Sequence, residues 1–458
     1  MNNKYIITIV ILVVIVASIL DVSYAKTFEL IFTSYNNNWN ILIFITVSFA
    51  CIVCQYYILK YIKEKTKSLY KSNKTNIFKV NLYQLVTVSQ YFLISITLIA
   101  IIQIIALSNY STNLLIISST TSYALSIGIT ALLAYKFFFW FKSDKNLTVF
   151  SYGLACVALV FNLCITSILT ELILLGKPLQ LGPHFGTAGY SPIQGSSMEV
   201  INNLYLITSI VSFLMLWLST VIFLFHYQNR DNADKKRKFT KYWIIAIIPL
   251  TYFLSQFTFV FDFFSIFNGI PITISILLTL IFLLGKPIGG ILFGIVFFIL
   301  RKGLPKENPV NDYLGISSFG ILILFVANQG IALSNALYPP YGLSTVSFLG
   351  LASYMFMIGL YSSAISSAQD KNLRKTIRNS TIDQSKLLST LSHAELERQL
   401  EDKVSTIASN KKTFWENQTG IYSSLADGDI KQYVLLIIEE LKKNSLKDNP
   451  ENKRGFRI

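Results

Sequence analysis

Long apolar runs separated by short polar segments make up most of the chain. A helix needs about 20 apolar residues to cross roughly 30 Å of hydrocarbon. Runs near this length occur at 5–24, 40–61, 82–107, 114–141, 147–175, 203–227, 243–261, 272–300, 314–337 and 343–365. They lack the strict apolar and polar alternation of a membrane β-barrel. Only helices and closed barrels satisfy the backbone in lipid, so the pattern predicts an all-α, polytopic transmembrane helical bundle of about ten helices.

The first apolar run has two interpretations. It follows the segment MNNK and ends near the small residues SYA, which fits both a signal peptide and a first transmembrane helix. Cleavage after Ala25 would leave nine helices, whereas retention gives ten. The rest of the arrangement is the same in both cases. We therefore divide the chain into residues 1–25, a transmembrane helical domain over 26–365 and a cytoplasmic helical tail over 366–458.

Basic residues gather on every second connection between these runs. The intervening connections hold only Lys26 and Lys177. Eighteen Lys and Arg lie in the other four connections, at 60–79, 142–145, 228–241 and 301–306. Cytoplasmic loops of membrane proteins carry such an excess. The bias predicts that these four connections and the C-terminus are cytoplasmic in a multi-pass protein of the cell membrane.

The composition agrees with a membrane protein and argues against other classes. Of the 458 residues 53% are hydrophobic and only 14% are charged, against about 25% charged in soluble proteins. The net charge of +15 is concentrated in the connections on one side of the predicted membrane, which is explained by topology. We therefore expect the lipid bilayer as a partner and no nucleic acid. The four cysteines fall in predicted spans and the three histidines are far apart. No metal site, disulfide pattern or cofactor is predicted.

The tail beyond residue 366 is polar and has helical periodicity. A first apolar stripe predicts an amphipathic helix over 373–407 that forms a homodimer or binds a cytoplasmic protein. A second helix is predicted in SSLADGDIKQYVLLIIEELKK. The residues of the first stripe are Leu373, Ile377, Leu387, Leu391, Leu400, Val404 and Ile407.

The segment LLGKPIGGILFG places Lys286 inside an apolar run. A charged side chain in hydrocarbon costs at least about 2.5–3.5 kcal/mol, so such residues are functional candidates. Pro287 and the surrounding glycines weaken a helix and admit close approach of a neighbour. One interpretation is a structural kink whose lysine forms an ion pair with Glu171 or Asp262. The other is a discontinuous helix that lines a polar cavity, as in transporters.

Neutral polar residues at comparable depth have two interpretations as well. They could line the same cavity, or they could form hydrogen bonds between helices, and we favour the hydrogen bonds. These residues are Asn162, Gln256, Asn328 and Gln329.

The connection at 176–200 differs from the other predicted outer turns. It is long, rich in Gly and Pro, and apolar, whereas most connections in compact domains are short. One interpretation is a cap over the bundle with His184 and Tyr190 as ligand contacts, and the other is an ordinary irregular loop.

Three segments resemble an uncharacterised family of archaeal multispanning membrane proteins. They are GKPIGGILFG, YPPYGLSTVSFLGLASYMFMIGLYSSAISSAQDKNLRKTIRNS and QTGIYSSLADGDIKQYV, within residues 283–440. The family has no established activity or site. The resemblance implies a membrane protein of an archaeal cell envelope and carries over no functional residue.

Three classes of function remain. An enzyme is least favoured, because no metalloprotease, phosphate-binding or paired-aspartate motif occurs. The number of helices, the breakable helix and the intramembrane polar groups favour a solute or ion transporter. The alternative is a membrane sensor or signalling protein, in which the outer loop binds a ligand and the tail acts through a separate partner.

Overall fold

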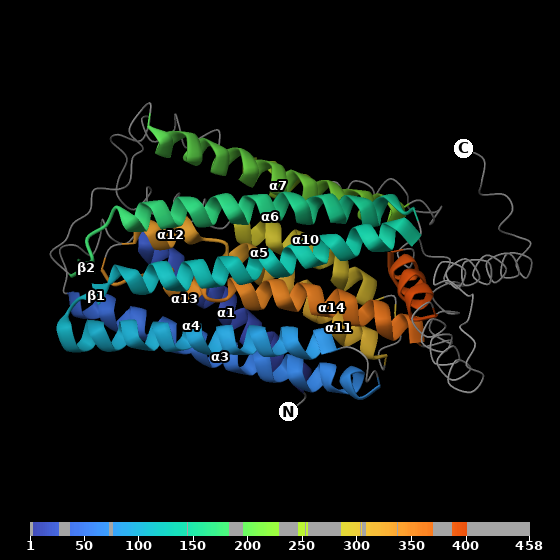
Figure 1. Cartoon of the computed structure of the whole chain (residues 1–458), viewed down its shortest axis with the longest axis horizontal. Helices are drawn as coiled ribbons and strands as arrows, with labels where there is room; N and C mark the ends of the chain where they lie inside the picture. Colours follow the sequence, from blue (N-terminus) through green and yellow to red (C-terminus); the bar gives the residue numbers. More distant parts are fainter. Residues whose placement is uncertain are drawn as a thin grey trace, which may run out of the picture.

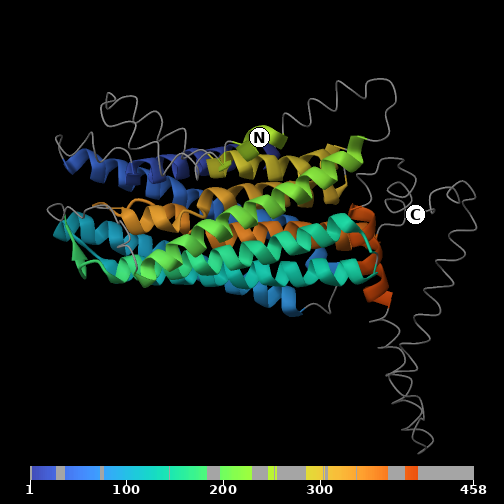
Figure 2. The same cartoon turned by 90° about the horizontal axis from the view of Figure 1, so that it is seen from above.

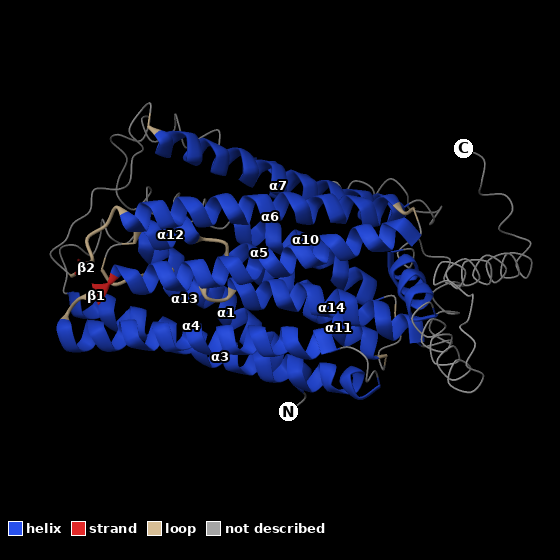
Figure 3. Ribbon diagram, in the orientation of Figure 1, coloured by secondary structure: helices blue, strands red, loops and turns tan. Residues whose placement is uncertain are grey.

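Long helices lie side by side along one common direction (Figures 1 and 3). The structure is a computed structural model. It describes residues 3–26, 37–72, 77–143, 145–182, 196–228, 246–251, 253–254, 285–302, 304, 308–336, 338–369 and 387–400. Its labelled helices are α1 (Asn3–Lys26), α3 (Asn37–Ser72), α4 (Ile77–Leu107), α5 (Thr112–Ser143), α6 (Leu147–Leu175), α7 (Ser197–Gln228), α10 (Gly285–Lys302), α11 (Pro309–Ala327), α12 (Gly330–Asn335), α13 (Leu343–Val346) and α14 (Leu349–Gln369).

A short strand pair and a tail helix mark the two ends of the bundle. Strands β1 (Tyr110–Ser111) and β2 (Gln180–Leu181) pair antiparallel, with Tyr110 opposite Leu181. We call this the strand end. The helix over residues 387–400 lies at the opposite end, which we call the tail end, and the view from above separates the two ends in the same way (Figures 1 and 2).

Eight segments of the described chain are helical, long and apolar enough to cross a membrane. They coincide with eight of the ten predicted runs. Large apolar side chains such as Ile102 and Ile105 of α4 are exposed, as on a lipid-facing helix. The chain is therefore a multi-pass, helical integral membrane protein. The predicted runs 243–261 and 272–300 lie partly outside the described residues, so the count of ten stays a prediction.

Helix α14 occupies the centre of the bundle, packed chiefly on α11 and also on α5. It is buried along nearly its whole length because apolar and small residues cover all its faces. Two glycines bring α11 and α14 into backbone contact. A Cβ at Gly320 would lie 2.8 Å from the Phe356 Cα, and one at Gly359 would lie 2.6 Å from the Ser317 nitrogen.

Helix α10 leaves one prediction untested and supports another. It is continuous from Gly285 to Lys302, but the turn before Pro287 lies outside the described residues, so the predicted kink stays a prediction. The expected close approach of a neighbour is confirmed at Gly294. A Cβ there would lie 3.0 Å from the Ser318 carbonyl oxygen, and the Ser318 Oγ donates to the Gly294 carbonyl at 2.8 Å.

The helix over residues 387–400 packs on the tail end of the bundle. Leu387 and Leu391, which the sequence analysis assigned to a dimer or partner interface, are buried in the chain's own core. The Asn146 amide donates to the Thr390 Oγ1 at 3.1 Å, which joins this helix to the α5–α6 connection. The other five residues of the predicted stripe are Leu373, Ile377, Leu400, Val404 and Ile407. Leu400 ends the described helix, and the other four lie outside the described residues.

Candidate functional site at two interrupted helices

Two neighbouring membrane crossings are interrupted. The crossing Pro309–Ser334 consists of α11 and α12, separated by Asn328 and Gln329. The crossing Leu343–Gln369 consists of α13 and α14. At their junction the Phe348 N–H bonds three residues back, to the Thr345 carbonyl at 3.1 Å. An interruption leaves backbone groups without helical partners, so side chains must satisfy them.

An asparagine cluster surrounds the first interruption. It comprises the buried Tyr123, Asn162 and Asn328 with Thr208 and Gly330. The Asn328 Nδ2 donates to the Asn162 Oδ1 at 3.1 Å. The Tyr123 hydroxyl donates to the Asn328 Oδ1 at 3.1 Å and accepts the Gly330 N–H at 3.0 Å. The structure thus brings Asn162 of α6 and Asn328 together in a hydrogen bond between helices.

Gly330 begins α12 at a place where no side chain fits. A Cβ there would lie 2.5 Å from both the Tyr123 hydroxyl and the Thr170 Oγ1. The close approach lets the Gly330 N–H, the first of α12, reach the tyrosine hydroxyl. The segment Asn328-Gln329-Gly330 therefore ends one helix and starts the next, with Asn328 and Gly330 buried.

An Asp21 cluster surrounds the start of the second crossing. Asp21 is fully buried near the end of α1. Its Oδ1 accepts the Gly342 N–H at 2.9 Å, and its Oδ2 accepts the Thr345 N–H at 3.1 Å and Oγ1 at 2.7 Å. The carboxyl group thereby caps α13, whose N-cap Gly342 has the left-handed φ of 90° and no capping side chain. Asp21 is not among the site residues predicted from the sequence.

Side chains from three further helices reach the same segment. The Ser344 Oγ donates to the Ser48 Oγ of α3 at 2.8 Å. The Ser122 Oγ of α5 donates to the Val346 carbonyl at 2.6 Å. Amide groups of α3 and α4 bind Ser347, at the junction of α13 and α14. We include these members, with Gln55 and Gln90, in the Asp21 cluster.

Glu171 is the described acid of the predicted intramembrane ion pair. Its Oε1 accepts hydrogen bonds from the Ser167 Oγ at 2.8 Å and the Thr120 Oγ1 at 3.2 Å. Lys286 lies in the first turn of α10, but its side chain and Asp262 lie outside the described part. The predicted pairing is therefore not tested.

Of the other predicted candidates, Gln329 alone lies in the described part of the chain. Gln329 is the N-cap residue of α12 and makes no side-chain cap. Gln256, His184 and Tyr190 lie outside the described residues, so the predicted cap over 176–200 stays a prediction.

Polar contacts close the strand end of the bundle. The Lys177 ammonium donates to the Ala336 carbonyl at 2.7 Å. Tyr110 of β1 stacks on Tyr338, with ring centroids 6.2 Å apart. Burial raises the pKa of both phenols above the usual value, so both hydroxyls stay neutral. These contacts tie the connection between α12 and α13 to the strand pair.

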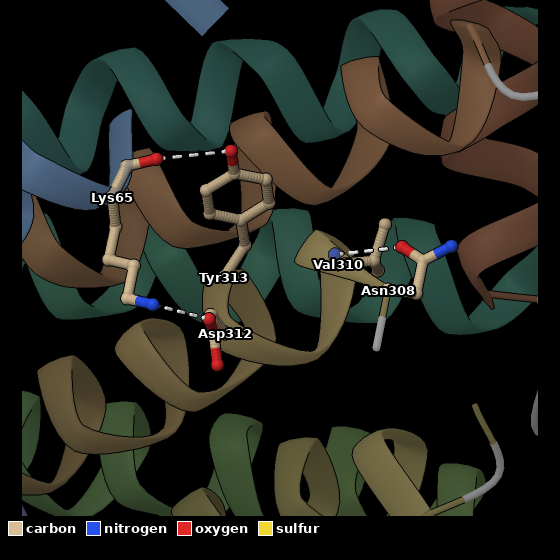
Figure 4. Close-up of polar contacts among 5 residues, drawn as sticks. All are labelled: Lys65, Asn308, Val310, Asp312 and Tyr313. Atoms are coloured by element: carbon tan, nitrogen blue, oxygen red, sulfur yellow. Dashed lines mark hydrogen bonds and ion pairs between the residues drawn. The ribbon is translucent and has the colours of Figure 1, made fainter. Parts of the chain in front are cut away.

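An ion pair joins α3 to α11 at the tail end (Figure 4). The Lys65 Nζ lies 2.8 Å from the Asp312 Oδ2, and the Tyr313 hydroxyl donates to the Lys65 carbonyl at 3.2 Å. Asn308 caps α11 by accepting the Val310 N–H at 3.0 Å. Asp312 also lies in the first turn of α11, where a negative charge is stabilised by the helix dipole.

Comparisons with known protein families, curated proteins and solved structures found no match for this chain. The resemblance of residues 283–440 to an archaeal membrane family therefore stays a prediction. Among the described residues, no group of three or more His, Cys, Asp and Glu side chains is placed to hold a metal ion.

Proposed function

We propose that this multi-pass membrane protein is a solute or ion transporter whose site is built around the two interrupted crossings. Transporters bind solutes and ions at discontinuous helices because an interruption frees backbone groups inside the membrane. One observation carries the proposal. The crossings α11–α12 and α13–α14 are neighbours, both are interrupted, and buried polar side chains of five other helices gather around them.

Contacts at the two ends of the bundle suit a gating role. The Lys65–Asp312 ion pair joins an interrupted crossing to α3 at the tail end, and Lys177 binds Ala336 beside the other end of the same crossing. Partly exposed polar contacts exchange their partners for water at small cost, typically about 0–1 kcal/mol for a surface ion pair. Opening one end while the other stays closed would give alternating access.

We further propose that the tail end faces the cytoplasm and that α1 is retained as the first of ten helices in the cell membrane. The described basic residues support this orientation, because Lys142, Arg301 and Lys302 lie in the last turns of α5 and α10, and these helices end near the tail end. The burial of Asp21 against α13 supports retention of α1.

A reporter fused after Lys71, Lys236 or Leu391 should read cytoplasmic, and a reporter inserted near Gly186 should read external. The reason is the concentration of eighteen basic residues in four alternate connections. Activity of paired phosphatase and fluorescent-protein fusions measures each position. An external reading at Lys71 would reverse the proposed orientation.

Purified protein in proteoliposomes should conduct or exchange a cation, and Asn328→Ala should reduce the initial rate at least about tenfold, which corresponds to about 1.4 kcal/mol. Asn328 links α6 to the first interruption, so its loss should disturb the site. Entry of radioactive sodium and rubidium, with pyranine inside to report protons, measures the rate. Asn203→Ala, at an exposed position of α7, is the matched control. If each ion enters empty liposomes as fast as liposomes that contain the wild-type protein, cation transport is contradicted.

A sensor that acts through its tail is the second candidate. The observation that favours it is the docking of the 387–400 helix on the bundle. Arg398 lies 3.5 Å from the Tyr361 hydroxyl of α14, and the Ser143 Oγ donates to Glu397. A change at the interrupted crossing α13–α14 would reach this helix through α14. Such a protein would bind its ligand without net flux in the proteoliposome measurement.

A further inference from the structure

The junction of α13 and α14 holds two buried amide oxygens that no donor in the described chain reaches. The Gln55 Nε2 of α3 donates to the Ser347 Oγ at 2.6 Å, and the Gln90 Nε2 of α4 donates to the Ser347 carbonyl at 3.1 Å. The two glutamines are only 2% and 0% exposed. The Oε1 atom of each is buried and has no hydrogen-bond partner among the described residues.

The chemistry of Ser347 fixes the orientation of both amides. A backbone carbonyl accepts hydrogen bonds and cannot donate, so the Gln90 group that faces it must be the NH₂. The Ser347 hydroxyl hydrogen is used in a bond of 2.6 Å to the Ser344 carbonyl, so its oxygen can only accept from Gln55. Turning either amide over would place two acceptors in contact. Both Oε1 atoms are therefore genuine acceptors, and they belong to amides anchored on one residue.

Oxygens of this kind bind either a hydrogen-bond donor or a cation. A buried acceptor without any partner destabilises the fold, so a bound water molecule or a cation must satisfy it. Carbonyl oxygens beside an interrupted helix coordinate monovalent ions in membrane proteins. The Asp21 carboxyl group, bound to Thr345 two residues before Ser347, places two further buried oxygens on the same segment.

We propose that Gln55 and Gln90 coordinate a monovalent cation at the junction of α13 and α14, and Na⁺ is the ion used to probe it. The described set offers neutral oxygens and one carboxyl group that already holds three donors. A divalent ion such as Ca²⁺ requires more carboxylate ligands. For its role the site rests on the proposed transport function, as the transported or coupling ion, but its binding is tested without flux.

The test is the apparent thermal unfolding midpoint of the purified full-length protein in NaCl, with choline chloride holding the ionic strength constant. Na⁺ binds the folded state, so it should raise the midpoint by a few degrees in a saturable manner. Gln55→Leu and Gln90→Leu should each abolish this rise. Gln103→Leu is the matched control on α4, because the Gln103 Oε1 already accepts the Ser111 N–H at 3.0 Å. It should keep the full Na⁺ response even if its baseline midpoint falls.

The wild-type titration decides the proposal even if the variants fail to fold. Equal midpoints in NaCl and choline chloride would overturn it, since a water molecule bound to the two oxygens would give that result. A response to CaCl₂ but not to NaCl or KCl would overturn the monovalent class. A Na⁺ response without any flux in proteoliposomes would leave the cation site standing and contradict only the transport function.

Discussion

Replacing Gly359 by valine should strongly destabilise the described membrane domain. A Cβ at Gly359 would lie 2.6 Å from both the Ser317 nitrogen and the Tyr313 carbonyl oxygen. These are backbone atoms of α11, so no side-chain rotation relieves the overlap, and the two central helices must move apart. We expect the free energy of unfolding to fall by about 3 kcal/mol or more, seen as a lower apparent melting temperature and a lower monodisperse yield in detergent.

Gly128→Ala is the matched control for this change. A Cβ at Gly128 in the middle of α5 meets nothing within 4 Å, so alanine should be neutral or should stabilise by roughly 0.5–1 kcal/mol through helix propensity. Gly320→Val should resemble Gly359→Val, because Gly320 contacts the backbone of Phe356 in the same interface. If Gly359→Val melts like Gly128→Ala, then α11 and α14 are not in backbone contact.

The helical crossings could be predicted from the sequence because their signal is long and redundant. Twenty apolar residues in lipid leave the backbone little choice but a helix. The central position of α14 is also visible in retrospect, since FLGLASYMFMIGLYSS has small or apolar residues on every face. The partner of α14 could not be predicted, because a glycine in a helix shows that a neighbour comes close but not which one.

The candidate site was harder to predict because a charged residue in an apolar run is a stronger sequence signal than a neutral polar one. Lys286 and its glycines suggested the interruption, whereas the described interruptions lie at Asn328-Gln329 and at Ser347-Phe348. A neutral polar residue costs little free energy in a membrane both at a contact between helices and at a helix end. Its sequence position therefore cannot separate the two cases. Asn162 and Asn328 were named, but their pairing needed the fold.

In the tail too, the sequence pattern predicts a helix but does not predict the surface that covers its apolar side. The apolar stripe correctly indicated a helix around Leu387 and Leu391. A stripe specifies only that an apolar surface will be covered, and in the described structure the chain's own bundle covers these two residues. The dimer or cytoplasmic partner therefore stays a prediction for the rest of the tail.

Asp21→Ala should destabilise the protein strongly. The measurement therefore shows whether the first apolar run is a retained helix or a cleaved signal peptide. The change leaves the Gly342 N–H, the Thr345 N–H and the Thr345 hydroxyl without their acceptor. Each buried donor left unsatisfied costs about 1–3 kcal/mol, so we expect a total loss of at least about 3 kcal/mol. Asp21→Asn should lose less, because its one carbonyl oxygen still accepts from this segment. Apparent melting temperatures of the purified variants measure the order wild type, Asp21→Asn, Asp21→Ala.

Ser23→Ala provides the control on the same helix, because the Ser23 Oγ bonds only within α1, to the Ile19 carbonyl at 2.6 Å. It should change the melting temperature little, since a local hydroxyl bond to the preceding turn adds little to a helix. A signal peptide cleaved after Ala25 would remove Asp21, and then all three variants would melt like the wild type. That result would require a mature protein in which other groups cap α13. The ordered loss expected here, together with an intact N-terminal mass, would instead make α1 a permanent part of the site, since its carboxyl group holds the start of the second interrupted crossing in place.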